Sequence, residues 1–250
     1  MPLRPCAEDA RLYERAAIAG RGSPPRALIL GVTRELHDLP WPPGTRPLAV
    51  DRSQGMIDAL WPGPPGSVVR GDWTAPPFAH ESWDVVLCDG GLHLLSYPGG
   101  QTLLARAIRA VLRPGGRFVT RLFAPPRRRE RPEEVIADLR AGRVANVNLL
   151  KLRLGMALQE DPASGVALAR VWEAVAANGD VARVGRSLGW SAAHLATLNS
   201  YRDCADRYHF VTLDEAAGSF REAGWRLQTV GHGTYELAER CPVVTFVPAD

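Results

Sequence analysis

The stretch RALILGVTRELHDLP, Arg26 to Pro40, predicts a buried strand, a glycine turn and a short helix. Its apolar run Ala27–Leu30 is typical of a strand that is covered on both faces. A loop that holds a phosphate or a nucleoside directly after such a strand usually carries two or three glycines. This loop has Gly31 alone. The stretch therefore indicates a ligand-binding loop of unusual composition, whose ligand must be inferred from the rest of the chain.

Short apolar runs and helical patterns alternate up to about residue 124. Helices are expected from the N-cap residue Ser53 and over about residues 101–112, where apolar residues recur at helical spacing. Strands are expected at residues 27–30, 48–50, 68–70, 85–88 and 117–123. Alternation of this kind predicts a parallel, doubly wound sheet.

The pattern changes after Phe123 and changes back near residue 206. Between these points it is purely helical, with a helix start at Pro132-Glu133-Glu134. Near the end, residues 226–230 and 243–247 predict two strands. The loop between them has only about a dozen residues, which is too short for a helical crossover, so the two strands should pair antiparallel.

These patterns together predict the fold class. We expect an α/β protein with a Rossmann-like, doubly wound, seven-stranded sheet whose last strand is antiparallel, plus a helical insertion. Residues 1–124 and 206–250 should form the α/β domain, and residues 125–205 should form the insertion, a cap over the substrate.

Composition excludes several classes of function. Among 250 residues, 30 basic and 27 acidic side chains leave a net charge of +3, too small to imply nucleic acid or an anionic membrane as a partner. The four cysteines are far apart and predict neither a disulfide framework nor a metal site. No apolar run approaches 18 residues. We expect a soluble, cytoplasmic protein without a metal, either a monomer or a homodimer.

Four features follow the predicted strands in order: Gly31, Asp51, the pair Asp72-Trp73, and Asp89-Gly90-Gly91. An acid 20 residues after the first glycine commonly binds both hydroxyls of a ribose. Asp72 is a candidate acceptor for the amino group of an adenine, beside the aromatic face of Trp73. Each feature alone is also explained as a turn or a helix cap. Their order and spacing predict a nucleoside-type cofactor at the carboxyl ends of the strands.

The chain resembles the class I S-adenosylmethionine-dependent methyltransferases. The resemblance lies in LAVDRSQGMIDAL, VVRGDW, SWDVVLCDGGLHLL and AIRAVLRPGGRFVTRLF, above all in Leu-Arg-Pro-Gly-Gly-Arg before the fifth strand. It departs from the family at the first motif, acid-x-Gly-x-Gly-x-Gly, where this chain has Ile29, Gly31, Thr33 and Glu35. A bacterial group with a Leu-Gly-Val-Thr-x-Glu loop is similar, which implies that S-adenosylmethionine is retained.

The resemblance and the strand ends together imply a set of cofactor contacts. Tyr13, in a predicted N-terminal helix, is expected to cover the cofactor as such helices often do in this family. The full set is Tyr13, Gly31, Val32, Thr33, Asp51, Arg52, Met56, Gly71, Asp72, Trp73, Asp89, Gly90 and Gly91.

Acceptor contacts are expected after the fourth strand and around the return from the insertion. His93 is the candidate general base, because a neutral nucleophile must lose a proton; a loop histidine is the simpler alternative. Arg121 is expected either at the carboxyl ends of the strands, with the other acceptor contacts, or in a structural ion pair. Packing in the core or capping of a helix equally explains several other residues of the acceptor set. The candidate set is His93, Arg121, Asn148, Tyr201, Arg202, Tyr208, His209 and Tyr235.

The predicted function is methyl transfer to an N, O or S atom of a small or medium-sized acceptor, namely a metabolite, a natural product or a short peptide. One alternative is a non-catalytic S-adenosylmethionine-binding or scaffold protein with a degenerate first motif. Another is a nucleic-acid methyltransferase that uses the run Arg127-Arg128-Arg129. A solvated loop explains that run more simply, so no nucleic-acid partner is expected.

Overall fold

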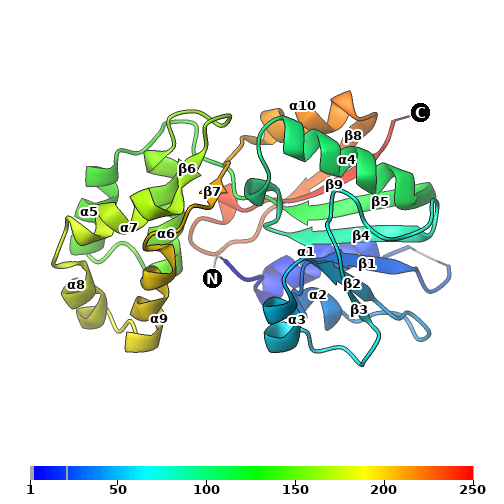
Figure 1. Ribbon diagram of the computed structural model, residues 1–250, viewed down its shortest axis with the longest axis horizontal. Coiled ribbons are helices and arrows are strands. Elements are labelled where there is room, and N and C mark those ends of the chain that lie inside the picture. The colour runs from blue at the N-terminus through cyan, green and yellow to red at the C-terminus, as the bar shows by residue number, and fades with distance from the viewer. Residues whose placement is uncertain (1–2, 21, 250) are drawn as a thin grey trace.

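A seven-stranded mixed sheet forms the centre of the computed structural model, which describes residues 3–20 and 22–249 (Figure 1). The strand order is β3-β2-β1-β4-β5-β9-β8. β9 runs antiparallel to both of its neighbours, and the pairs among β1 to β5 are parallel. The strands are β1 (Ala27–Leu30), β2 (Leu48–Asp51), β3 (Val68–Arg70), β4 (Trp83–Asp89), β5 (Leu112–Arg121), β8 (Trp225–Gly231) and β9 (Val243–Pro248). The predicted fold class is confirmed.

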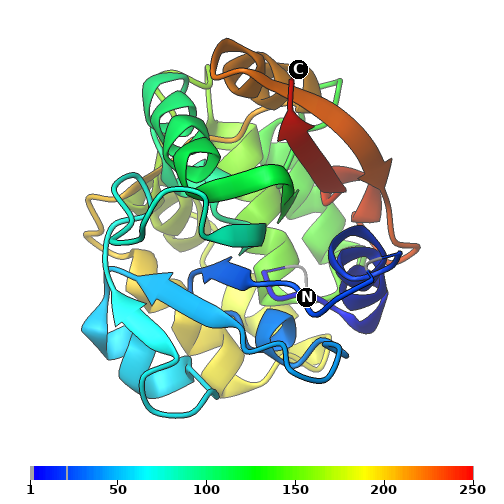
Figure 2. The ribbon, with the colours of Figure 1, turned by 90° about the vertical axis from the view of Figure 1, so that its right-hand side faces the viewer.

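Helices cover both faces of this sheet, as Figure 2 shows end-on. Alternate residues of β1 point to opposite faces, so Ile29 packs with α1 and α2, and Leu28 packs with α4 and α10. One face has α1 (Ala7–Ala17), α2 (Arg34–His37) and α3 (Gln54–Leu60), and the other has α4 (Gly99–Val111) and α10 (Leu213–Glu222). The two-sided burial explains why the strand sequences are almost wholly apolar.

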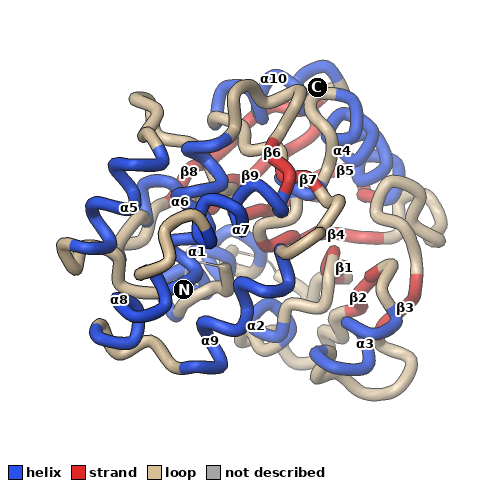
Figure 3. The backbone as a smooth tube through the Cα atoms, turned by 60° about the vertical axis from the view of Figure 1, so that its left-hand side comes forward, coloured by secondary structure: helices blue, strands red, loops and turns tan. Residues whose placement is uncertain are grey.

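Five helices lie between β5 and α10 in the sequence, beyond the carboxyl ends of the parallel strands (Figures 1 and 3). Their core includes Leu139, Leu150 and Val171, and it continues to Phe123 and Cys241 of the sheet unit. They are α5 (Pro132–Arg140), α6 (Val147–Leu158), α7 (Leu168–Ala176), α8 (Val181–Ser187) and α9 (Ala192–Ala196). The division into an α/β domain and an insertion over residues 125–205 remains a prediction, because these helices share a core with the sheet unit.

Some boundaries differ from the prediction. β5 begins at Leu112, before the Pro114-Gly115-Gly116 turn, because Leu112 pairs with Trp83 ahead of a shift in register. A two-residue pair, β6 (Val166–Ala167) and β7 (Arg207–Tyr208), was not predicted, since two residues give no periodicity. Over the described residues, no helix is both long and apolar enough to cross a membrane.

Candidate active site

The registers of the parallel strands bring four of the predicted residues into one row. Leu30 lies between Val50 and Cys88, so the next residue of each chain segment, Gly31, Asp51 and Asp89, lies at one edge of the sheet. Asp51 also pairs with Arg70, and Gly71 follows it. The carboxyl edge of the sheet therefore collects the features that the sequence placed at separate strand ends.

Gly31 lies between Asp51 and Trp73. Its φ of +93° is in the region that favours glycine, and its N–H donates to the carbonyl of Val50 at 2.8 Å. Trp73 Nε1 donates to the same carbonyl at 2.9 Å. A Cβ on Gly31 would lie 3.4 Å from the Trp73 ring and 3.9 Å from Asp51 Oδ2. The single glycine of the first loop is thus required by backbone conformation, and it stands between an acid and an aromatic ring.

Asp51 and Asp72 differ in their hydrogen-bond donors. Asp51 Oδ1 accepts from the backbone N–H of Ser53 at 2.8 Å, at the start of α3. Asp72 is exposed, and its Oδ1 accepts from both the N–H and the hydroxyl of Thr74 at 2.7 Å. These hydrogen bonds lower the pKa of Asp72, so its carboxylate is ionised at neutral pH. Both acids are available as hydrogen-bond acceptors at the rim.

The glycines after β4 have an internal cause. A Cβ on Gly91 would lie 2.3 Å from Cys88 Sγ and 3.0 Å from the Trp73 ring. A Cβ on Gly90 would lie 2.7 Å from the Phe123 ring, and Gly90 also has a φ of +59°. The sequence attributed these glycines to close approach of a ligand; packing against the chain's own side chains already requires both.

A buried polar network lies beside this turn. Arg121 donates through Nε to Asp89 Oδ1 at 2.7 Å and through Nη2 to Asp89 Oδ2 at 3.0 Å. Its Nη1 donates to Asp9 Oδ2 at 3.0 Å and contacts the hydroxyl of Tyr235 at 3.4 Å. The hydroxyl of Tyr13 donates to Asp89 and accepts from the backbone N–H of Arg121. The structure thus brings together Arg121 and Tyr235, which were expected at the acceptor, and Asp89 and Tyr13, which were expected at the cofactor, and these side chains bind one another.

Burial dominates the electrostatics of this network. The Arg121 and Asp9 side chains are fully buried, and Asp89 is 4% exposed. Burial raises the pKa of Asp89 and, well above its ordinary value, that of Tyr13. Tyr13 covers the network instead of facing an open site. Sequence reasoning missed Asp9, although an acid within the buried stripe Asp9, Tyr13, Ala17 of α1 was a usable signal.

His93 lies in an aromatic cluster between the sheet and the helices beyond it. It belongs to the short 3₁₀ helix η1 (Leu92–Leu94), and its ring is 4.4 Å from Tyr208, 5.1 Å from Phe123 and 5.6 Å from Phe210, centroid to centroid. Its carbonyl accepts from the N–H of His209 at 2.8 Å, which joins η1 to β7. We call His93, Phe123, Tyr208, Phe210 and Tyr201 the aromatic cluster.

The protonation of His93 follows from this burial. The side chain is 7% exposed, and burial lowers its pKa to about 3, so the imidazole is neutral at pH 7. A general base needs a pKa near the working pH. The burial that lowers this pKa therefore argues against the proton-removing role that the sequence suggested for His93. Its Nδ1 is buried and has no hydrogen-bond partner among the described residues.

The remaining acceptor candidates lie around the cluster. Asn148 is half-buried in the first turn of α6. Arg202 is directed away, with its guanidinium 5.0 Å from the ring of Trp172. His209 is buried and hydrogen-bonds through Nδ1 to the carbonyl of Pro162 at 2.8 Å. Asn148 lies three residues before Lys151, on the same face of α6.

The outer cofactor candidates are less enclosed. Thr33 is the N-cap of α2, but its side chain makes no capping hydrogen bond, and Val32 beside it is buried. Arg52 and Met56 are exposed, Met56 to 46%, at the start of α3. They border the rim from the side of β2.

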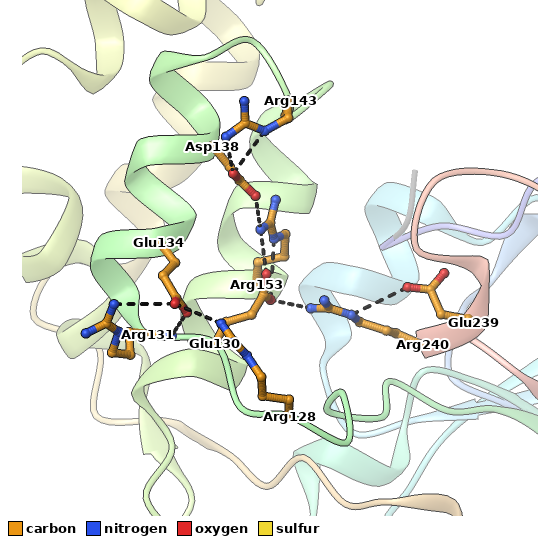
Figure 4. A network of polar contacts seen from close by, with 9 residues as sticks. All are labelled: Arg128, Glu130, Arg131, Glu134, Asp138, Arg143, Arg153, Glu239 and Arg240. Carbon is orange, nitrogen blue, oxygen red and sulfur yellow. Dashed lines mark hydrogen bonds and ion pairs between the residues drawn. The ribbon is translucent and has the colours of Figure 1, made fainter.

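Two arginines of the run Arg127–Arg129 make contacts within the fold, although all three are exposed. Arg128 pairs with Glu134 at 2.9 Å, and Arg129 donates twice to the carbonyl of Ala157 near the end of α6. Figure 4 shows Arg128 with its partner Glu134, which also pairs with Arg131. These contacts favour a structural explanation of the run over phosphate binding.

Comparison with known proteins is consistent with this geometry. Residues 31–120 match a family model described as a methyltransferase domain. No group of His, Cys, Asp or Glu within the described residues could hold a metal ion. A search of curated proteins gave no match.

Three solved structures show the same fold. The CcbJ methyltransferase from Streptomyces caelestis covers 97% of this chain and 89% of its own at 18% identity, with a TM-score of 0.55. The 1,6-didemethyltoxoflavin-N1-methyltransferase from Burkholderia thailandensis, with bound S-adenosylhomocysteine, covers 98% and 80% at 16% identity, with a TM-score of 0.52. A protein from Rhodobacter sphaeroides described as a putative zinc-dependent alcohol dehydrogenase covers 99% and 92% at 12% identity, with a TM-score of 0.60.

Proposed function

We propose that this protein is an S-adenosylmethionine-dependent methyltransferase that transfers a methyl group to a nitrogen, oxygen or sulfur atom of a small or medium-sized acceptor. The acceptor would be a metabolite, a natural product or a short peptide. The observation that carries the proposal is the place of the aromatic cluster. It begins two residues after the Asp89-Gly90-Gly91 turn and lies against the helices beyond the strand ends. Ligands of open α/β sheets bind at this edge.

The residues at the strand ends fit the methyl donor. S-adenosylmethionine has no pyrophosphate, so a loop with Gly31 alone does not need a row of converging N–H groups. Asp51 would bind the ribose hydroxyls and Asp72 the adenine amino group, with the ring beside Trp73. The network of two carboxylates and one guanidinium favours a positive charge nearby, such as the sulfonium.

When bound, the cofactor supplies a methyl group on an electrophilic sulfonium. The chain's own residues must orient the acceptor in line with it and exclude water. The aromatic cluster provides an apolar wall for this purpose. We propose that His93, neutral at pH 7, orients the acceptor through its unpartnered Nδ1, and that it does not take the acceptor's proton.

The aromatic cluster supports the proposed acceptor class. Aromatic rings from η1, β7 and the end of β5 suit a flat or apolar molecule better than a nucleic-acid duplex. The Burkholderia protein is named as an N1-methyltransferase of 1,6-didemethyltoxoflavin, and this chain is similar to it in fold. The engaged arginine run does not favour a nucleic-acid substrate.

The test is isothermal titration of the purified protein with S-adenosylmethionine and, separately, with S-adenosylhomocysteine. We expect micromolar binding of both and at least a tenfold loss of affinity in Asp51→Ala, because the ribose contact is removed. Asp58→Ala is the matched control, since Asp58 is exposed on α3 and hydrogen-bonds only to Gln54 of its own helix among the described residues. Its affinity should equal that of the wild type.

Two outcomes would contradict the proposal. Absence of heat and of thermal stabilisation with either ligand would mean that the lone-glycine loop has lost the cofactor. Binding without turnover over a broad panel of acceptors would favour the alternative, a non-catalytic S-adenosylmethionine-binding or scaffold protein.

A further inference from the structure

Lys151 is the only lysine in the chain, and it is buried. It lies in α6 with 6% of its surface exposed, in the apolar sequence VNLLKLRLGMAL. Its Nζ donates to the carbonyl and to the hydroxyl of Thr197, both at 2.8 Å, and lies 4.7 Å from the centroid of the Tyr201 ring. All of these partners are formally neutral.

Other buried cations of the molecule are paired with carboxylates. Arg121 contacts two carboxylates, and Arg153 contacts Glu130 and Asp138. Lys151 forms no ion pair with any carboxylate of residues 3–20 and 22–249, and burial lowers its pKa to about 8. An ammonium that stays charged at pH 7 in such a place is costly unless an anion accompanies it.

Lys151 faces the aromatic cluster. Lys151 and Gly155 lie one turn apart on the same face of α6. A Cβ on Gly155 would lie 2.9 Å from the ring of Phe210, and Phe210 stacks on His93. At the other end of this face, the ring of Tyr201 contacts Lys151 and, edge to face, Tyr208. Lys151 and His93 therefore lie at opposite ends of one aromatic wall.

Two buried polar groups of this wall lack the partners they require. His93 Nδ1 has no hydrogen-bond partner among the described residues, and Lys151 has no counter-ion among them. Buried groups of this kind are rare and often indicate a ligand site. A structural role for Lys151 also exists, because Thr197 is the C-cap of α9. However, α9 has only five residues, and a cation at a helix end contributes only about 0.3–1 kcal/mol.

We propose that Lys151 binds the carboxylate of the acceptor, so that the substrate is an organic acid with an aromatic or other flat portion against the aromatic cluster. The inference rests on the proposed function, because it assigns a substrate class to that site. The carboxylate lies at the Lys151 end, and the atom to be methylated lies toward His93 and the strand ends.

The experiment uses the fact that the chain has a single lysine. Protein labelled with [13Cε]lysine gives one side-chain resonance, whose pH titration reports Lys151 alone. Titrations are run in buffer, with benzoate, and with benzamide as the neutral analogue at the same ionic strength. We expect a midpoint near 8 in buffer, an upward shift of about 0.5–1 pH unit with benzoate, and no shift with benzamide. Acetate, which is small enough for any carboxylate site, is a second probe.

Variants separate binding from structure. Lys151→Met keeps the apolar stem and should lose the thermal stabilisation by benzoate, whereas Arg202→Ala, which removes a nearby exposed cation, should keep it. If neither acetate nor benzoate shifts the resonance at millimolar concentration, or if only inorganic phosphate does, the proposal is wrong. S-adenosylmethionine binding is measured on the same samples, so failure of the cofactor site is recognised separately.

Discussion

At the scale of single residues, the sequence predicted which residues lie at the carboxyl ends of the parallel strands, but not which partners their side chains bind. Asp51, Asp72 and Trp73 follow strands, and a strand end fixes their place in any parallel sheet. For Arg121 the sequence left a rim contact and an ion pair open, and the structure has the ion pair. Its partner Asp9 is 112 residues away in the chain, and no local pattern gives a contact of that kind.

The Arg121 network should contribute strongly to stability. Arg121→Met would leave Asp9 and Asp89 buried without a counter-ion, so we expect a loss of about 3–5 kcal/mol in the free energy of unfolding. Arg113→Met removes a partly exposed pair with Asp84 and should cost less than about 1 kcal/mol. Urea denaturation at pH 7 gives both values. Equal losses in the two variants would show that the network is not specially stabilising.

Buried His93 should make the protein less stable in acid. Its pKa falls from 6.5 in the unfolded chain to about 3 in the fold, so below pH 6.5 the unfolded state binds a proton that the folded state does not. Stability from this group is complete above pH 6.5 and falls by about 1.4 kcal/mol per pH unit as the pH drops toward 3. His93→Phe should therefore lose about 2 kcal/mol less than the wild type between pH 7.5 and 5. Parallel pH profiles from denaturation curves would refute this.

At the scale of elements, long periodic segments were predictable and short ones were not. Two features readable in the sequence bound α10: Thr212 begins a capping box and accepts from the N–H of Glu215, and Gly224, with a φ of +79°, follows the helix. β6 and β7 exist only because the chain returns from α9 beside η1, which is a tertiary effect. The purely helical pattern after Phe123 predicted a helix at α6. What each face of α6 packs against depends on contacts with other elements, which the pattern does not give.

Gly155 gives a test of the α6 face. Alanine is a better helix former than glycine by about 1 kcal/mol, so Gly218→Ala in α10, where an added Cβ meets nothing within 4 Å, should stabilise the protein by up to that amount. Gly155→Ala would instead push on Phe210, and the usual overpacking penalty of about 1–3 kcal/mol less a helix gain of about 1 kcal/mol gives a net cost of up to about 2 kcal/mol. Thermal unfolding of the two variants measures the contrast. The same sign of change in both would show that Phe210 moves aside freely.

At the scale of the whole molecule, the sequence predicted the order of the elements and the sheet topology, because crossover rules leave few alternatives. It did not predict how the helices of residues 132–201 meet the sheet. That contact depends on the core shared by Phe123, Cys241 and Leu150, and on side chains such as Lys151, whose partners Thr197 and Tyr201 lie in another helix, η2 (Thr197–Tyr201). The meeting of Gly31, Asp51 and Asp89 at one edge of the sheet was therefore predictable, because topology decides it, whereas the contacts around Lys151 and His93 were not.

One polar contact chain joins the two parts and gives a test of their coupling (Figure 4). Glu130 binds Arg153 of α6 and Arg240 of η3 (Ala238–Arg240), which precedes β9. Glu130→Gln removes the charge common to both pairs. We expect amide hydrogen exchange to become at least tenfold faster in α5, α6 and η3, with the β1–β4–β5 core unchanged, because these segments would open locally without global unfolding. Glu133→Gln, an exposed neighbour, is the matched control. Faster exchange throughout the sheet would instead mean that the helices and the sheet unfold as one unit.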